Sequence, residues 1–223
     1  MTGASVVVFG ATGTAGSELV RQALLDPRIG EVRAVVRRAI GFSHAKLREV
    51  PCSNFDDLSA IGEHLRDVRA CFFCLGISSR KTEEASYRRV TVGYALSAAR
   101  TLLVASPEHS YHYLSGGGAD VTGKSWMMWA RVKGEAENEL GRLGLERLFI
   151  HRPGYIHPED EHARPGVSSA IGRAIFPLLR AALPRTTILA VELARAMLEL
   201  EFSSRRGGVF ENSALLELGR RAG

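Results

Sequence analysis

The feature that most constrains this chain is a glycine-rich turn near its start, "GATGTAG" at residues 10–16. It follows the apolar run "SVVVF", which suits a buried strand, and leads into "SELVRQALL", whose apolar spacing is helical. A strand, a glycine turn and a helix in this order direct backbone N–H groups at a pyrophosphate. The spacing differs from the G-x-G-x-x-G form, so the context carries the prediction of a dinucleotide site. In it Gly10 permits the turn, Gly13 admits the phosphates and Gly16 lets the helix pack closely on the strand.

Strand-like and helical segments alternate along the rest of the chain. Strand patterns are found at residues 31–38, 45–50, 68–76, 110–118 and 145–154. Helical patterns are found at residues 56–67, 88–103 and 125–142. Such alternation predicts an α/β fold with a doubly wound parallel Rossmann sheet in the strand order 3-2-1-4-5-6.

The last 70 or so residues carry two more helical stretches at 170–183 and 190–202, then a short strand at 207–212 and a terminal helix. This is too little chain for a separate domain. We therefore expect one Rossmann domain over residues 1–223, in which residues 153–223 form a small C-terminal lobe on the substrate side.

The end of the second predicted strand indicates which dinucleotide binds. NAD sites usually have an acidic residue there, which holds the adenine ribose. This chain has Arg37 and Arg38 instead, and a guanidinium matches a 2′-phosphate in charge and in shape. NADP(H) is therefore predicted in preference to NAD(H). The alternative is that both arginines are solvated surface charges.

Composition excludes several classes of function. Lys and Arg exceed Asp and Glu by 29 to 24, and this excess is scattered rather than gathered in a stripe, which argues against nucleic acid. No apolar run approaches the roughly 20 residues that span a bilayer, so we expect no membrane segment and a cytoplasmic protein.

Two motifs that suggest metal or redox chemistry have simpler interpretations. The C-x-x-C pair Cys71 and Cys74 lies in a strand-like run, where an offset of three puts the two sulfur atoms on opposite faces. "HPEDEH" at residues 157–162 follows a strand and suits a solvated loop better than a metal site. We predict no metal.

With these motifs in hand, the chain resembles the atypical short-chain dehydrogenase/reductases, and most of all the group of Tat-interacting oxidoreductases. The similarity runs through "VVVFGATGTAGSELV", "CFFCLGISSR", "LSGGGAD", "VKGEAE" and "RPG", nearly the full length. The resemblance implies NADP(H) bound along the C-terminal edge of the sheet. The residues that it assigns to the cofactor are Gly10, Thr12, Gly13, Thr14 and Gly16 at the pyrophosphate, Arg37 and Arg38 at the 2′-phosphate, Leu75 and Gly76 at the adenine ribose, and Pro153 and Gly154 at the nicotinamide.

The resemblance also implies a catalytic set, in which Ser115 polarises a carbonyl and Lys133 holds the nicotinamide ribose. The family's third group is a tyrosine four residues before the lysine, and this chain has Trp129 there. An indole N–H only donates a hydrogen bond and does not titrate near neutral pH. The usual acid–base chemistry therefore lacks its proton donor.

Three interpretations stay open. The chain is a reductase in which Tyr155, a water or Lys133 supplies the proton, although a packed tyrosine also explains Tyr155. It is a sensor that binds NADPH and acts through a protein partner. Or it is a reductase of a ring compound, such as a quinone, which needs little help from an acid. The substrate is not identified, and both a protein partner and a homodimer are left open.

Overall fold

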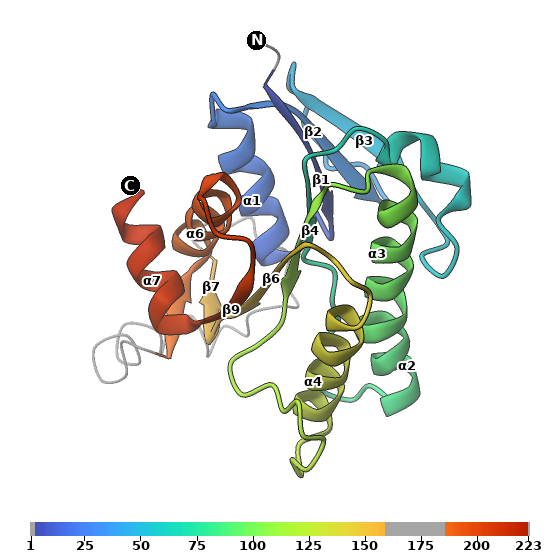
Figure 1. Cartoon of the computed structure of the whole chain (residues 1–223), viewed down its shortest axis with the longest axis vertical. Coiled ribbons are helices and arrows are strands. Elements are labelled where there is room, and N and C mark those ends of the chain that lie inside the picture. Colours follow the sequence, from blue (N-terminus) through green and yellow to red (C-terminus); the bar gives the residue numbers. More distant parts are fainter. Residues whose placement is uncertain (1–2, 159–185, 223) are drawn as a thin grey trace.

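The computed structural model describes residues 3–158 and 186–222. Its centre is a parallel sheet of seven strands in the order β3-β2-β1-β4-β5-β6-β9 (Figure 1). The strands are β1 (Ala4–Phe9), β2 (Ile29–Val36), β3 (Leu47–Pro51), β4 (Ala70–Phe73), β5 (Ser110–Leu114), β6 (Arg147–Arg152) and β9 (Gly208–Glu211). The predicted order of the first six strands is therefore confirmed, and β9 adds a seventh beside β6.

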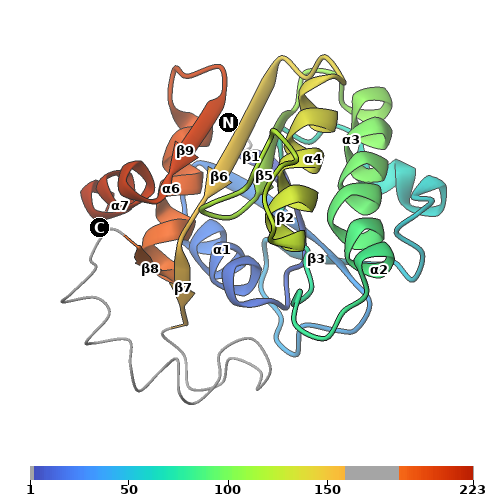
Figure 2. The ribbon, with the colours of Figure 1, turned by 90° about the horizontal axis from the view of Figure 1, so that it is seen from below.

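Helices cover both faces of this sheet (Figures 1 and 2). One layer is formed by α1 (Thr14–Leu25), α6 (Ala190–Phe202) and α7 (Asn212–Arg221). The other is formed by α2 (Glu84–Arg88), a π-helical turn η2 (Arg89–Gly93), α3 (Tyr94–Ala105) and α4 (Met128–Gly141), with the 3₁₀ helix η1 (Ser59–Leu65) at its edge. In the part of the chain described, no helix is long and apolar enough to cross a membrane.

The sequence of β1 explains why both faces are covered. Val6 and Val8 pack against the α1 and α6 layer, whereas Val7 and Phe9 pack against the layer of α3 and α4. All four are fully buried. A strand that is apolar on both faces is stable only when helices exclude water from both.

One predicted helix has a different form. Residues 56–67 were expected to be α-helical, and the structure has the 3₁₀ helix η1 in their place. Its buried side chains are Ile61 and Leu65, next to the buried Leu58. The N–H of Ile61 donates to the carbonyl of Leu58, a bond that spans three residues. Hydrogen bonds of this span define a 3₁₀ helix, which is common in short connecting segments.

The C-terminal stretch contributes to the main body of the fold. Helix α6 packs between α1 and α7, and β9 continues the sheet. Two short strands, β7 (Tyr155–His157) and β8 (Thr187–Leu189), form a separate two-stranded parallel sheet. The predicted helix at 170–183 lies outside the described residues, so the lobe over residues 153–223 stays a prediction.

Candidate cofactor and substrate site

The glycine turn between β1 and α1 lies directly against the end of β4. Gly10 has a φ of +81°, and a Cβ there would lie 2.6 Å from the backbone nitrogen of Leu75. A Cβ on Gly16 would lie 2.2 Å from the carbonyl oxygen of Gly10. Both glycines are therefore required by close packing of backbone on backbone, as the sequence predicts.

The first turn of α1 presents uncompensated N–H groups. Gly13 is the N-cap residue, and no side chain caps the helix. Its own N–H donates to the Gly10 carbonyl at 3.0 Å, and no acidic residue stands in the first helical turn. Unbonded N–H groups and the positive end of the helix dipole together attract an anion. This end of α1 suits a phosphate.

A cleft of about 360 Å³ opens beside this turn, between the ends of β1, β2 and β4. Seven of the residues predicted to bind the cofactor line it, and Thr14 and Gly16 follow in α1. The residues of the lining are Gly10, Ala11, Thr12, Gly13, Val35, Val36, Arg37, Arg38, Phe55, Cys74, Leu75 and Gly76.

Arg37 and Arg38 follow β2 at the rim of this cleft, and both are exposed. Within residues 3–158 and 186–222, neither guanidinium takes part in a hydrogen bond or an ion pair. No carboxylate of the described chain lines the cleft. This rim of the cleft therefore carries two positive charges and, among the described lining residues, no acidic one.

A second cavity, of about 620 Å³, lies at the ends of β5 and β6. Pro153 and Gly154, which are predicted to lie at the nicotinamide, line this cavity together with Tyr155 and Trp129. The remaining described lining residues are Gly116, Gly117, Arg152, Thr186, Glu211, Asn212 and Ser213. Ser115 and Lys133 are not among the lining residues, so the structure separates the predicted catalytic residues into two groups.

The Trp129 indole lies against the glycine loop that follows β5. A Cβ on Gly116 would lie 3.7 Å from Cζ3 of the indole, and one on Gly118 would lie 3.4 Å from Cη2. Gly118 also has a φ of +91°, which favours glycine. The loop thus leaves room for a ring larger than a phenol at position 129.

Lys133 stands one turn further along α4 and points at the end of β5. Its Nζ donates to the Leu114 carbonyl at 2.8 Å and lies 4.9 Å from the centre of the Tyr113 ring. Burial lowers the pKa of the Lys133 ammonium to about 8, although the charges of Glu137 and Cys74 act in the opposite direction. Position and spacing agree with a lysine at the cofactor side of the sheet edge.

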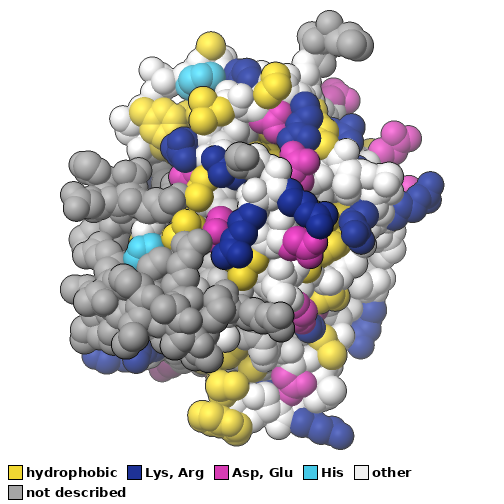
Figure 3. All heavy atoms as spheres, turned by 90° about the vertical axis from the view of Figure 1, so that its left-hand side faces the viewer, with side chains coloured by type: hydrophobic (Ala, Val, Ile, Leu, Met, Phe, Trp, Pro, Cys, Tyr) yellow, Lys and Arg dark blue, Asp and Glu magenta, His cyan; other side chains and the backbone are white. Residues whose placement is uncertain are grey.

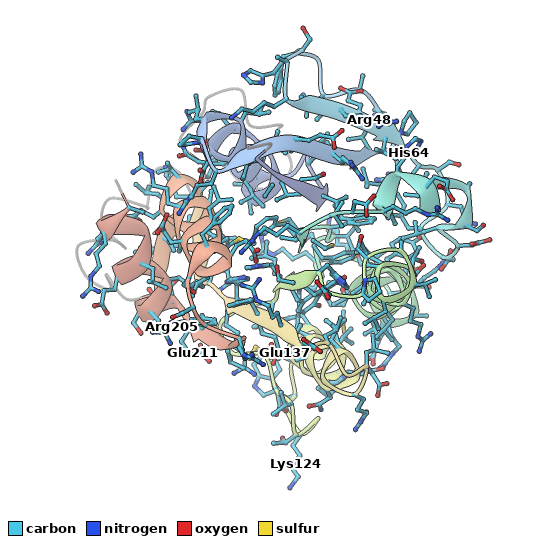
Figure 4. The ribbon with its side chains drawn as sticks, turned by 45° about the horizontal axis from the view of Figure 1, so that its top comes forward. Arg48, His64, Lys124, Glu137, Arg205 and Glu211 are labelled. Carbon is cyan, nitrogen blue, oxygen red and sulfur yellow. The ribbon has the colours of Figure 1, made fainter. Side chains whose placement is uncertain are left out.

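Ser115 donates its hydroxyl hydrogen to a buried carboxylate. Its Oγ lies 2.5 Å from Oε1 of Glu137, which is one turn beyond Lys133 on α4. The guanidinium of Arg152 donates two hydrogen bonds to the same carboxylate, of 3.0 and 2.5 Å, and one of 2.9 Å to Glu211. Figure 4 labels the two acidic residues, Glu137 and Glu211. Ser115 therefore belongs to a network formed by Ser115, Glu137, Arg152 and Glu211.

Sequence reasoning missed the other three members of this network. Glu137 was visible as an acidic residue four after Lys133, on the same helix face. Arg152 was visible as the charged residue just before "PG". Neither spacing says that the two side chains meet, because they belong to different elements and only the packing of α4 on β6 joins them.

The structure places Cys71 and Cys74 on the two faces of the sheet. Cys71 is buried in the cluster under α3 and α4, and Cys74 packs against the cluster on the other face. The prediction of opposite faces is confirmed, and both thiols are unbridged. Burial raises the pKa of Cys74 to about 12, although the positive charge of Lys133 acts to lower it. Among the described residues no group of three potential ligands is found; "HPEDEH" lies largely outside them.

The surface supports the reading of charge as scattered. Figure 3 shows basic and acidic side chains interspersed on the face that it draws, with no continuous basic stripe among its described residues. The described part of that face therefore has no single-sign patch of the kind that typically binds a nucleic acid backbone.

Comparison with known proteins gives relatives over the whole chain, although no family model matches it. Protein HTATIP2 of Rattus norvegicus is 28% identical over 229 residues, which cover 99% of this chain and 91% of that protein. Protein fmp52, mitochondrial, of Emericella nidulans is 28% identical over 75% of this chain and 73% of its own length. Among solved structures, the Bordetella bronchiseptica enzyme WbmH in complex with NAD+ superposes with a TM-score of 0.70 at 16% identity, over 97% of this chain and 79% of that one.

Proposed function

We propose that this chain, an atypical short-chain dehydrogenase/reductase of the Rossmann type, binds NADP(H) and reduces a small carbonyl or quinone compound. The observation that carries the proposal is the uncapped start of α1 in one cleft with Arg37 and Arg38. A dinucleotide phosphate needs an anion site and a cationic rim, and the cleft supplies both. The structure of WbmH, which has a similar fold, is a complex with NAD+, and this supports a nicotinamide cofactor here.

The preference for NADP(H) rests on the rim of the cleft. Arg37 and Arg38 have no partner within the described chain, so binding a 2′-phosphate would not break an existing ion pair. Charge-assisted bonds of this kind contribute about 1.5–3 kcal/mol each. With NAD(H), the same rim would lack the carboxylate that usually holds the ribose hydroxyls.

In this proposal the reacting end of the cofactor lies at Pro153 and Gly154, in the larger cavity. A bound nicotinamide supplies a hydride. Lys133 would orient its ribose from beneath, and its lowered pKa lets it exchange a proton near neutral pH. For a carbonyl substrate, the proposed proton donor is Tyr155, the tyrosine in the described lining of the cavity. Ser115, the residue proposed to polarise the carbonyl, is hydrogen-bonded to Glu137.

A reductase is favoured over a sensor because the cavity beside Trp129 has room for a second small molecule. A protein that only read the cofactor would need no such space. The cytoplasmic location expected from composition stays a prediction, since the fungal relative is named as mitochondrial. A protein partner and a homodimer also stay predictions.

The test is thermal melting of the purified chain with NADPH and, separately, with NADH. We expect NADPH to raise the melting temperature more than an equal concentration of NADH does. Replacing Arg37 and Arg38 by glutamine should weaken NADPH binding about tenfold or more and leave NADH binding nearly unchanged. Arg48→Gln is the matched control, because this exposed arginine lies on β3 next to His64 and away from the cleft (Figure 4). The absence of a shift with either nucleotide would refute the proposal.

A further inference from the structure

We infer that the cavity beside Trp129 accepts a flat, conjugated, uncharged ring of the quinone class, and that Glu211 is the residue that discriminates against anionic rings. The inference rests on the proposed function and narrows its substrate. Three properties of the described lining carry it: shape, the lack of an available acid, and charge.

The lining of the cavity includes glycine backbone and aromatic rings. Gly116 and Gly117 present no side chains to it, and a Cβ on Gly117 would lie 3.2 Å from the Pro153 carbonyl oxygen. Trp129 and Tyr155 supply its aromatic rings. Indole and phenol rings bind other rings by offset or edge-to-face stacking. A lining that combines side-chain-free glycine backbone with two aromatic rings therefore suits a planar ring better than a branched or bulky substrate.

The groups that would polarise a simple carbonyl are engaged elsewhere. Ser115 donates to Glu137, and Lys133 donates to the Leu114 carbonyl. The indole of Trp129 has no proton to give up near neutral pH. Tyr155, the acid proposed above for a carbonyl, contributes its ring to the lining, but its hydroxyl oxygen is buried. Hydride addition to an aldehyde or ketone creates an alkoxide, a strong base that needs a positioned acid at the moment of transfer. This site offers such a substrate little assistance.

A quinone avoids that requirement. The quinone takes up one hydride, which is two electrons and one proton, from the reduced nicotinamide, and the nicotinamide is oxidised to NADP+. The product is a hydroquinone monoanion, a phenolate with a pKa near 10 like that of tyrosine. Water then protonates its oxygen to give the neutral hydroquinone. No side-chain acid has to act during the hydride step.

Charge at the cavity selects against anions. Arg152 is the only described cationic residue in its lining, and its guanidinium is shared between two carboxylates, Glu137 and Glu211. Glu211 itself lines the cavity, and 56% of its side chain is exposed. Glu137 is buried and is balanced by two bonds from Arg152 and by the nearby Lys133, so Glu211 is the exposed negative charge of this wall. A sulfonate or carboxylate on the bound ring would be repelled, whereas an uncharged ring would not.

Binding of oxidised ligands without cofactor tests the charge selection directly. The chain has two tryptophans, and Trp126 is 88% exposed, so a Trp126→Phe background leaves Trp129 as the reporter. Quenching of its fluorescence gives dissociation constants for 1,4-naphthoquinone and for its 2-sulfonate. We expect the uncharged ring to bind about tenfold more tightly, and Glu211→Gln to reduce this ratio to about twofold. Glu217→Gln, on the exposed face of α7, should leave the ratio unchanged.

Turnover tests the acceptor class. With NADPH and the same preparation, kcat/KM for 1,4-naphthoquinone should exceed that for benzaldehyde by at least about a hundredfold, the usual contribution of the missing acid. The inference is overturned if the ratio of the two dissociation constants, for the sulfonate and for the uncharged ring, is the same with Glu211→Gln as without it. It is also overturned if benzaldehyde is turned over as fast as the quinone. Melting with NADPH distinguishes failure of this inference from failure of the proposed function. If NADPH raises the melting temperature but the quinone does not bind, only this inference is wrong. If NADPH does not raise the melting temperature, the proposed function is wrong as well.

Discussion

Ser115 and Glu137 are joined by a hydrogen bond of 2.5 Å between the end of β5 and the middle of α4. The carboxylate of Glu137 is almost completely buried, and Arg152 neutralises it with two further bonds. These three hydrogen bonds replace the water that the carboxylate loses on burial. The relationship makes Ser115 part of the packing between α4 and β6, in addition to any role toward a substrate.

The first prediction follows from this network. Glu137→Ala removes the carboxylate and leaves Arg152, which is only 16% exposed, with Glu211 as its remaining partner. We expect the free energy of unfolding to fall by about 3 kcal/mol, because the guanidinium stays buried without its main counterion. Urea unfolding of the purified protein measures this.

Glu139→Ala is the matched control for that experiment. Glu139 lies on the same helix, but its partner Arg142 is exposed, and such surface pairs contribute about 0.5 kcal/mol or less. Equal losses for the two substitutions would show that the buried network adds nothing to stability.

The glycine turn gives the second prediction. A Cβ on Gly16 would lie 2.2 Å from the Gly10 carbonyl, so Gly16→Ala must displace the turn from α1. We expect a loss of about 1–3 kcal/mol in stability and a weakening of NADPH binding by at least about tenfold. Melting curves and NADPH titrations measure the two effects.

Gly141→Ala serves as the comparison, because a Cβ at the end of α4 would meet no atom within 4 Å. This change should be neutral or stabilising by up to about 1 kcal/mol. If Gly16→Ala bound NADPH as tightly as Gly141→Ala does, the turn would not be the phosphate site.

The third prediction concerns three buried groups between the sheet and α6. The His112 ring lies 3.0 Å from His151 and 3.1 Å from Glu201, and all three are fully buried. Burial lowers the pKa of both imidazoles, and the neighbouring histidine lowers that of His151 further. Burial alone would raise the pKa of Glu201, but hydrogen bonds from His112 and Ser110 and the charge of Arg147 lower it overall.

The sign of the pH dependence follows. Unfolded histidines take up protons below pH 6.5, and the folded protein keeps these two neutral, so stability is present above pH 6.5 and is lost as the pH falls. Each imidazole contributes a slope of up to about 1.4 kcal/mol per pH unit. Denaturant unfolding between pH 7 and 5 should show this slope. His151→Gln should reduce it, whereas the same change at the exposed His44 should not.

The fourth prediction restores the missing acid. Trp129→Tyr would put a phenol one turn before Lys133, whose pKa is lowered to about 8. We expect NADPH-dependent reduction of benzaldehyde to rise at least about tenfold, because the hydride step then has a proton donor. Trp129→Phe controls for the change in ring size. Should tyrosine and phenylalanine give the same rate, the absence of a hydroxyl is not what limits this protein.

The arrangement of strands and helices could be predicted from local sequence patterns. Periodicity of two and of 3.6 residues identified the strands and helices, and the alternation of these elements gave the order of six strands. Gly10 and Gly16 were recognised because their constraint is local, acting within one turn of chain. Arg37 and Arg38 were placed at the cleft for the same reason, since they directly follow a strand of the sheet.

Contacts between side chains that are distant in the sequence became known only from the tertiary structure. The bonds from Ser115 and Arg152 to Glu137, the shared guanidinium at Glu211, and the entry of β9 beside β6 each join segments 15 to 60 or so residues apart. No local propensity encodes such pairs, because they depend on how helices pack across neighbouring strands. Trp129 illustrates the difference. The sequence alone showed that it stands in place of an acid, whereas only the fold showed that its indole lies against the glycine loop and lines a cavity.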